Sequence, residues 1–379
     1  MTLIPPNQSP VKREGAETYL LLMLYSFAAS VLLTRVYLEL TGFPQIGNGE
    51  LHIAHVLWGG LLLFAGLILP LVFANRWALA FGALIGGVGV GLFIDEVGKF
   101  ITQSNDYFYP AAAPIIYAFF LLMVLLYLQV RRPRMNHSRS NLYRALELLT
   151  EVIDHNLDPL EQEALKERLQ NVVSHPAEPN HAKLAGALLD YLAAEDLQAV
   201  TVPPGPFYRL RRRLDAFASR ILSQRRLRTL VIAGLLLAVL GSITQWIAIV
   251  LVFAVPDFLD SLIASLLVSE QFVRSQLSAT WFFVLVALDA IIGVILMYSL
   301  FLLLRRRDAA GCRWASFGLL VALTTANLLV FYFSQFAAVL TTIAQFVLLL
   351  GLLRYQRYIT HLSPDPQSGY RLRVTDRLL

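Results

Sequence analysis

The chain has 379 residues, of which 57% are hydrophobic and 15% charged, and its mean hydropathy is +0.60. Soluble domains carry about 45–50% apolar residues even when glycine is counted, so the composition excludes an ordinary soluble protein and favours a membrane protein. The net charge is +5, and the single cysteine, Cys312, excludes an intrachain disulfide and a thiolate cluster for zinc or iron–sulfur.

Eight stretches are long and apolar enough to span a bilayer, which takes roughly 20 mostly apolar residues. They cover about 18–40, 52–74, 78–101, 111–130, 229–255, 280–304, 313–333 and 336–356. We therefore expect an all-α polytopic membrane protein. Its predicted parts are a cytoplasmic tail (1–17), a four-span module (18–130), a helical cytoplasmic domain (131–228), a second four-span module (229–357) and a final cytoplasmic tail (358–379).

Basic residues near helix ends predict the orientation, because Lys and Arg favour the cytoplasmic side. Nearly all the basic clusters face inward if both termini are cytoplasmic. The clusters are Lys12–Arg13, Arg76, Arg131–Arg134, Arg305–Arg307, and Arg354 with Arg357.

Ionisable residues gather at the predicted outer ends of the first spans. His52 and His55 open the second span, and Asp95 and Glu96 close the third. Because consecutive spans run antiparallel, these four residues are expected at the same face and at similar depth. Ionisable groups within spans are costly and tend to be functional.

The four residues suggest a metal site. His52 and His55 are neighbours on one helix face, whereas consecutive helical residues point about a hundred degrees apart, so at most one carboxylate is expected to face the histidines squarely. Two histidines and one carboxylate match a mononuclear zinc or iron site with an open position for water. In such an enzyme His52, His55 and Asp95 would hold the metal and Glu96 would be the general base, acting on a lipid or cell-envelope substrate.

Other charges compete with this interpretation. Arg35 and Glu39 lie near the outer end of the first span, and Lys99 follows the carboxylate pair by one helical turn. A polar network without metal is therefore one alternative, and a transport or proton-handling site is another.

The transport alternative also involves Asp289, a carboxyl well inside the sixth span. A lone carboxyl in hydrocarbon either forms hydrogen bonds or belongs to a proton or ion path. We expect Asp289 either to bond with Asn327 or Gln345 on neighbouring spans or to couple protons to transport.

The residues around the ionisable cluster resemble bacterial multi-pass membrane proteins that have no known activity. In those proteins a His-rich span start is followed about forty residues later by an Asp-Glu pair. The matching residues, within about 50 of the 379, are His52, His55, Trp58, Gly59, Gly89, Gly91, Asp95 and Glu96. The chain departs from the pattern at Ala54, where a second adjacent histidine stands in those proteins. The resemblance implies a bacterial cytoplasmic membrane location and no particular reaction.

Glycines of the third span form two small-xxx-small pairs, Gly82 with Gly86 and Gly87 with Gly91. Such pairs allow a neighbouring helix to approach closely, so we expect tight packing here.

The cytoplasmic domain ends in a basic amphipathic stretch between Arg209 and Arg228. This pattern favours a helix lying on the anionic inner leaflet. Nucleic-acid binding is disfavoured, because the basic residues adjoin a membrane span. A scaffold that recruits a cytosolic protein partner through this domain is a third possible function.

Overall fold

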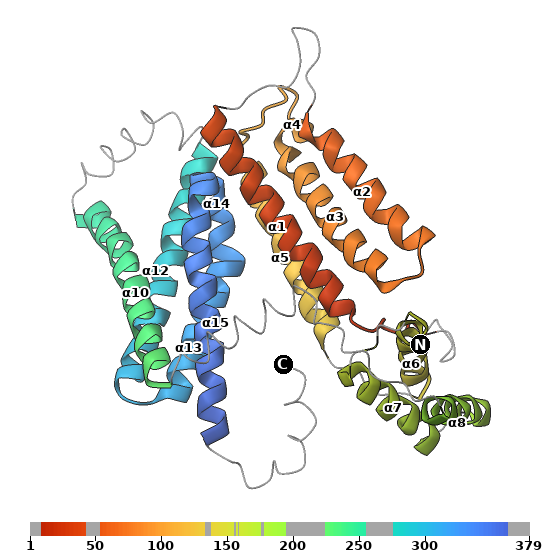
Figure 1. Ribbon diagram of the computed structural model, residues 1–379. Helices are drawn as coiled ribbons and strands as arrows, with labels where there is room; N and C mark the ends of the chain where they lie inside the picture. Colours follow the sequence, from red (N-terminus) through yellow and green to blue (C-terminus); the bar gives the residue numbers. More distant parts are fainter. Residues whose placement is uncertain are drawn as a thin grey trace. The chain divides into compact units, whose positions relative to one another are not determined.

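The computed structural model describes residues 9–42, 54–132, 138–154, 157, 159–175, 178–194, 224–254 and 276–362. These residues form helices and no strands (Figure 1). Eight helical segments among them are long and apolar enough to cross a membrane. The predicted all-α polytopic membrane fold is therefore confirmed.

The chain divides into two compact units. Unit 1 comprises Met1–Asn105 and Phe119–Arg209, and unit 2 comprises Asp106–Ala118 and Leu210–Leu379. The first three spans are thus grouped with the helices that follow the fourth span.

Unit 1 contains the spans α1 (Ala16–Thr41), α2 (His55–Val72) and α3 (Arg76–Asp95), the short helix α4 (Val97–Ile101), and most of α5 (Ala112–Arg131). α3 packs against both α1 and α2. It therefore forms the centre of this group of spans.

Small residues explain why α3 can take this central position. A Cβ added at Gly66 of α2 would lie 3.0 Å from the carbonyl oxygen of Gly82, and one added at Gly91 would lie 2.7 Å from the Cβ of Ser30 in α1. The Ser30 hydroxyl also donates to a backbone carbonyl of α3, that of Val88, at 3.1 Å. The predicted tight packing at these glycines is confirmed.

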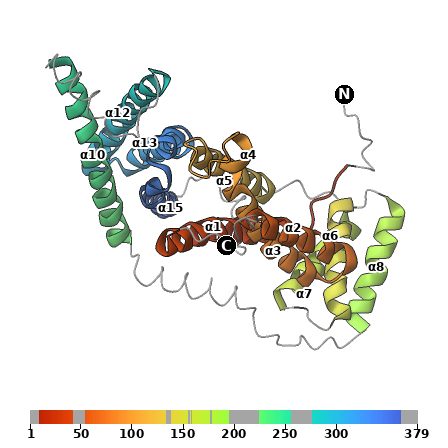
Figure 2. The ribbon, with the colours of Figure 1, turned by 90° about the horizontal axis from the view of Figure 1, so that it is seen from above.

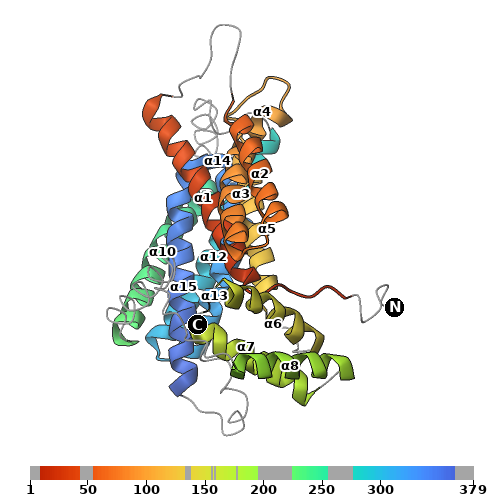
Figure 3. The ribbon, with the colours of Figure 1, turned by 45° about the vertical axis from the view of Figure 1, so that its right-hand side comes forward.

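Unit 1 also contains a bundle of three helices, α6 (Ser138–Ile153), α7 (Pro159–Ser174) and α8 (Pro179–Ala194) (Figure 3). We call it the three-helix domain. Apolar residues at three- and four-residue spacing give each helix one apolar face, and these faces meet in a buried core. The core includes Leu142, Ala145, Leu148, Leu165, Leu169 and Leu192. The predicted basic helix falls largely outside the described residues, which resume at Gln224.

Unit 2 contains α10 (Gln224–Ala254), α12 (Gln276–Leu304), α13 (Asp308–Val321), α14 (Asn327–Ser334) and α15 (Val339–Leu362). A π-helical turn, Ala322–Ala326, joins α13 to α14, and a 3₁₀ turn, Gln335–Ala338, joins α14 to α15. α10 packs against α12, and α13 packs against α12 and α15 (Figure 2). A shared apolar core, which includes Leu235, Leu303, Leu319 and Leu352, holds these helices together.

Candidate functional site: a charged cluster in unit 1

Five ionisable side chains meet in unit 1 where α1 and α3 end and α2 begins. They are Arg35, His55, Asp95, Glu96 and Lys99, and we call them the charged cluster. All of them except Lys99 contact a cluster member that is at least 40 residues away in the sequence. Helix packing therefore assembles the site.

His55 lies between the two carboxylates. Its Nε2 is 3.1 Å from Oδ2 of Asp95, and its Nδ1 is 3.0 Å from Oε1 of Glu96. Asp95 is 0% exposed and Glu96 1% exposed, so neither carboxylate is well hydrated. A neutral imidazole has one N–H donor and an imidazolium has two. Contact with a carboxylate at each ring nitrogen therefore favours the doubly protonated form.

The prediction that at most one carboxylate would face the histidine is wrong. α3 ends at Asp95, and Glu96 has φ −90° and ψ 10°, outside the α-helical geometry. The imidazole lies between the two side chains and has one ring nitrogen for each, at 3.1 Å from Asp95 and 3.0 Å from Glu96. Both carboxylates can consequently face His55.

Each carboxylate is also paired with a cation. Nε of Arg35 lies 2.6 Å from Oδ1 of Asp95, and Nζ of Lys99 lies 3.0 Å from Oε1 of Glu96. Arg35 additionally donates to the backbone carbonyl of Asp95 at 3.1 Å. Buried charges are tolerated when they are paired and hydrogen-bonded, and both carboxylates satisfy this condition.

The environment of Glu96 strongly favours its ionised form. Burial alone would raise the pKa of this carboxyl, but hydrogen bonds from His55 and Lys99 outweigh burial and lower the pKa to about 2. Its second oxygen, Oε2, is buried and has no hydrogen-bond partner in the part of the chain that the structure describes. An oxygen of this kind can accept a hydrogen bond from water or from a bound ligand.

One described residue among the predicted site residues at the outer span ends does not join the cluster. Glu39 is exposed and forms no hydrogen bond or ion pair with any described residue. His52 lies outside the described residues.

Asp289 lies on α12 in unit 2, where it is half-buried. The expected hydrogen bond to Asn327 or Gln345 is absent among the described residues. Instead, the Asn327 amide donates to Gln345 Oε1 at 2.8 Å and to the Thr342 hydroxyl at 3.1 Å.

The described residues contain no group of three His, Cys, Asp or Glu side chains that could hold a metal ion. The ring nitrogens of His55 both face carboxylate oxygens, and in that arrangement neither presents a lone pair to a metal. The predicted ligand set of His52, His55 and Asp95 includes a residue outside the described ones, so the zinc or iron site stays a prediction.

Sequence reasoning missed the ion pairs that attach the three-helix domain to the spans. Nη1 of Arg76, in the first turn of α3, lies 2.7 Å from Oε1 of Glu161 in α7. Nη2 of Arg168, also in α7, lies 2.9 Å from Oε1 of Glu14, just before α1. The only signal in the sequence was the presence of opposite charges on the two sides, which does not specify pairs.

Comparison with known proteins adds no assignment: no protein-family model, no curated protein and no solved structure matches the chain. The eight spans and the geometry of the charged cluster are therefore the features that bear on function.

Proposed function

We propose that this integral membrane protein binds and releases a proton at the charged cluster as one step of proton-coupled transport. The observation that supports this proposal best is the placement of His55 between two buried carboxylates, at 3.1 Å and 3.0 Å. Histidine is the side chain whose unperturbed pKa lies closest to neutral pH.

The cluster can lose the His55 proton without leaving a carboxylate unpaired. Arg35 remains on Asp95, and Lys99 remains on Glu96. Proton release thus changes the charge of the group from one excess cation to neutrality. If His55 were the only cation beside the two carboxylates, proton release would leave both carboxylates without a counter-charge. Two unpaired charges in a buried site cost a large amount of free energy.

Proton release would also change geometry. A neutral imidazole can donate to only one carboxylate, so one of the two His55 contacts must break. His55 begins α2, whereas Asp95 ends α3 and Glu96 follows it. The proton therefore controls a contact between two spans, and this is what coupling a proton to a conformational change requires.

The buried Oε2 of Glu96 gives the proposal a second supporting feature. This oxygen has no partner among the described residues, and the other oxygen of the same carboxylate accepts from His55 and Lys99. A hydrogen-bond donor of the transported substrate would be accepted here.

The proposal is tested with proteoliposomes adsorbed on a solid-supported membrane, where a rapid pH step reports charge movement before any substrate is known. Wild-type protein should give a transient current, and His55→Gln should lose most of it. His181→Gln is the matched control, because His181 lies in α8 and pairs with Glu178. Equal currents in wild type and His55→Gln would contradict the proposal.

A metal-dependent enzyme is the competing function. Metal analysis of purified wild-type protein and of His55→Ala separates the two. Proton binding predicts no stoichiometric zinc, iron or manganese in either protein. Stoichiometric metal in the wild type that is lost in His55→Ala would favour the enzyme and the ligand set that includes His52.

A further inference from the structure

The chain just before α1 is held along α6. We call Ser9–Glu14 the arm. Arg139 of α6 donates to the carbonyl of Ser9 at 2.8 Å and to its hydroxyl at 3.2 Å. At the other end of the arm, the backbone N–H of Glu14 donates to Oε2 of Glu147 at 2.6 Å. The arm is thereby anchored at both ends.

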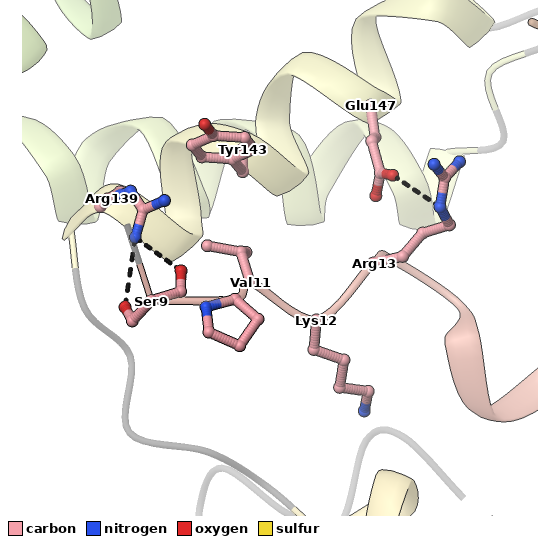
Figure 4. A pocket seen from close by; sticks show the side chains of 8 residues that line it. Ser9, Val11, Lys12, Arg13, Arg139, Tyr143 and Glu147 are labelled. Carbon is pink, nitrogen blue, oxygen red and sulfur yellow. Dashed lines mark hydrogen bonds and ion pairs between the residues drawn. The ribbon is translucent and has the colours of Figure 1, made fainter. Parts of the chain in front are cut away.

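A cavity of about 320 Å³ lies between the arm and α6 (Figure 4). Arm residues Ser9 to Arg13 line one side, and Arg139, Tyr143 and Glu147 line the other. The three α6 residues are four apart in sequence, so they share one face of the helix. The volume is enough for a phosphate ester with a small polar group attached.

Positive charge predominates in this cavity. Arg13 and Arg139 bring two positive charges to it, whereas Lys12 is paired with Glu17 at 2.8 Å, and Glu147 is its only lining carboxylate. Glu147 is already engaged, because Oε1 lies 3.3 Å from Nε of Arg13 and Oε2 accepts from the Glu14 amide. The cavity therefore favours an anion.

Arg13 has donors available for such an anion. Only its Nε takes part in the ion pair with Glu147, and its terminal nitrogens have no partner among the described residues. The side chain is 53% exposed. The Arg139 guanidinium lies over the Tyr143 ring, 5.2 Å from the ring centroid. This cation–π contact helps to orient the guanidinium.

The position of the cavity relates it to the membrane. The arm leads into α1, a span that begins at Ala16, and α6 begins shortly after α5 ends at Arg131. The cavity therefore adjoins the ends of two spans, where lipid headgroups lie, on the side predicted to be cytoplasmic. Basic pockets at this level bind anionic headgroups. Pro10, Val11 and Tyr143 add apolar surface for the glycerol region.

We propose that this cavity binds the phosphate of an anionic glycerophospholipid, with Arg13 as the main donor to the phosphate oxygens. Arg139, at the other end of the cavity, adds to its positive potential. A free phosphate ester offers the same charged group. The apolar lining beside two span ends favours the lipid. The site lies at the opposite end of α1 from the charged cluster and does not depend on its function.

The test measures binding of phosphatidylglycerol and phosphatidylcholine to the full-length protein in detergent by native mass spectrometry. The wild-type protein should bind phosphatidylglycerol about tenfold more tightly than phosphatidylcholine. Arg13→Gln should weaken this binding about fivefold, since one surface cation near a headgroup contributes about 1 kcal/mol. Arg313→Gln, which removes an exposed arginine of unit 2, should leave the affinity unchanged.

Three outcomes would overturn the proposal: equal affinity for the two lipids, wild-type affinity in Arg13→Gln, or equal weakening by Arg313→Gln. Glycerol phosphate is the competitor that separates the two sources of phosphate. It should displace the lipid only weakly, and displacement as effective as that by phosphatidylglycerol would overturn the lipid assignment. A thermal unfolding measurement checks that Arg13→Gln remains folded.

Discussion

Asp95 and Glu96 are adjacent and equally buried, but they depend on different partners. Asp95 accepts from Arg35 at its side chain and at its backbone carbonyl, and it also contacts His55. Glu96 contacts His55 and Lys99 through one oxygen. The Arg35 side chain is 10% exposed and the Lys99 side chain 23% exposed, so the arginine pair is the less hydrated one.

Arg35→Gln should therefore destabilise the protein more than Lys99→Gln. Removing one partner of a buried pair typically costs about 3–5 kcal/mol, because the other charge is left uncompensated. Lys99 is partly hydrated and leaves Glu96 in contact with His55, so its loss should cost less. Thermal unfolding of the two variants in one detergent measures the order, and an equal or larger loss for Lys99→Gln would disagree with the structure.

The lowered pKa of Glu96 predicts a pH dependence of stability. Its ordinary value is 4.5 and its folded value about 2, so ionised Glu96 stabilises the folded state fully above pH 4.5. This contribution is lost as the pH falls from 4.5 toward 2.

Glu96→Gln should thus unfold at a lower temperature than wild type at pH 7, and the difference should shrink as the pH falls below 4.5. Unfolding temperatures of both proteins between pH 7 and pH 3 give the comparison. A difference that stays constant over this range would show that the ionisation of Glu96 does not stabilise the folded state.

At the scale of single residues, the sequence identified the members of the charged cluster but not how they are arranged. The antiparallel order of the spans placed His55 with Asp95 and Glu96, and charge and depth added Arg35 and Lys99. The end of α3 at Asp95 could not be predicted, because Glu96 and Val97 do not break a helix by composition. The expectation of a single carboxylate also overlooked that an imidazole between two carboxylates can contact one with each ring nitrogen.

At the scale of the elements, α2 and α3 form a close pair through glycine. Gly66 of α2 faces the backbone of α3, whereas nothing lies within 4 Å of a Cβ added at Gly60 of the same helix. The glycine pairs in α3 predicted a close approach, but the pattern did not say which glycine of α2 would face them. That choice depends on the rotation of α2 about its axis.

Gly66→Ala should destabilise the protein, and Gly60→Ala is the control. A Cβ at Gly66 would approach the Gly86 nitrogen to 2.9 Å, which forces the helices apart at a cost of about 1–3 kcal/mol. The methyl group at Gly60 meets open space, and the helix gains up to about 1 kcal/mol from the better helix former. Thermal unfolding compares the two, and equal effects would contradict the backbone contact between α2 and α3.

At the scale of the whole molecule, the eight apolar helices identify an integral membrane protein, and hydropathy alone was sufficient to predict them. The ion pairs of Arg76 with Glu161 and of Glu14 with Arg168 were not predictable, because many pairings of opposite charges are compatible with one sequence. The orientation stays a prediction based on basic residues near span ends.

Cysteine labelling in intact cells tests that orientation. Ser104→Cys follows α4, and Ser174→Cys lies at the end of α7, both at exposed positions. With Cys312 buried, a membrane-impermeant maleimide should label Ser104→Cys in intact cells and Ser174→Cys only after permeabilisation. Labelling of Ser174→Cys in intact cells would reverse the predicted orientation.

The protonation of His55 is the central claim, and nitrogen-15 NMR of histidine-labelled protein measures it most directly. The chain has seven histidines, so the signals absent from His55→Gln identify His55. We predict two protonated ring nitrogens at neutral pH and loss of one proton as the pH is raised. A neutral imidazole at neutral pH, or an imidazolium that never releases its proton up to the alkaline limit of folding, would contradict the account.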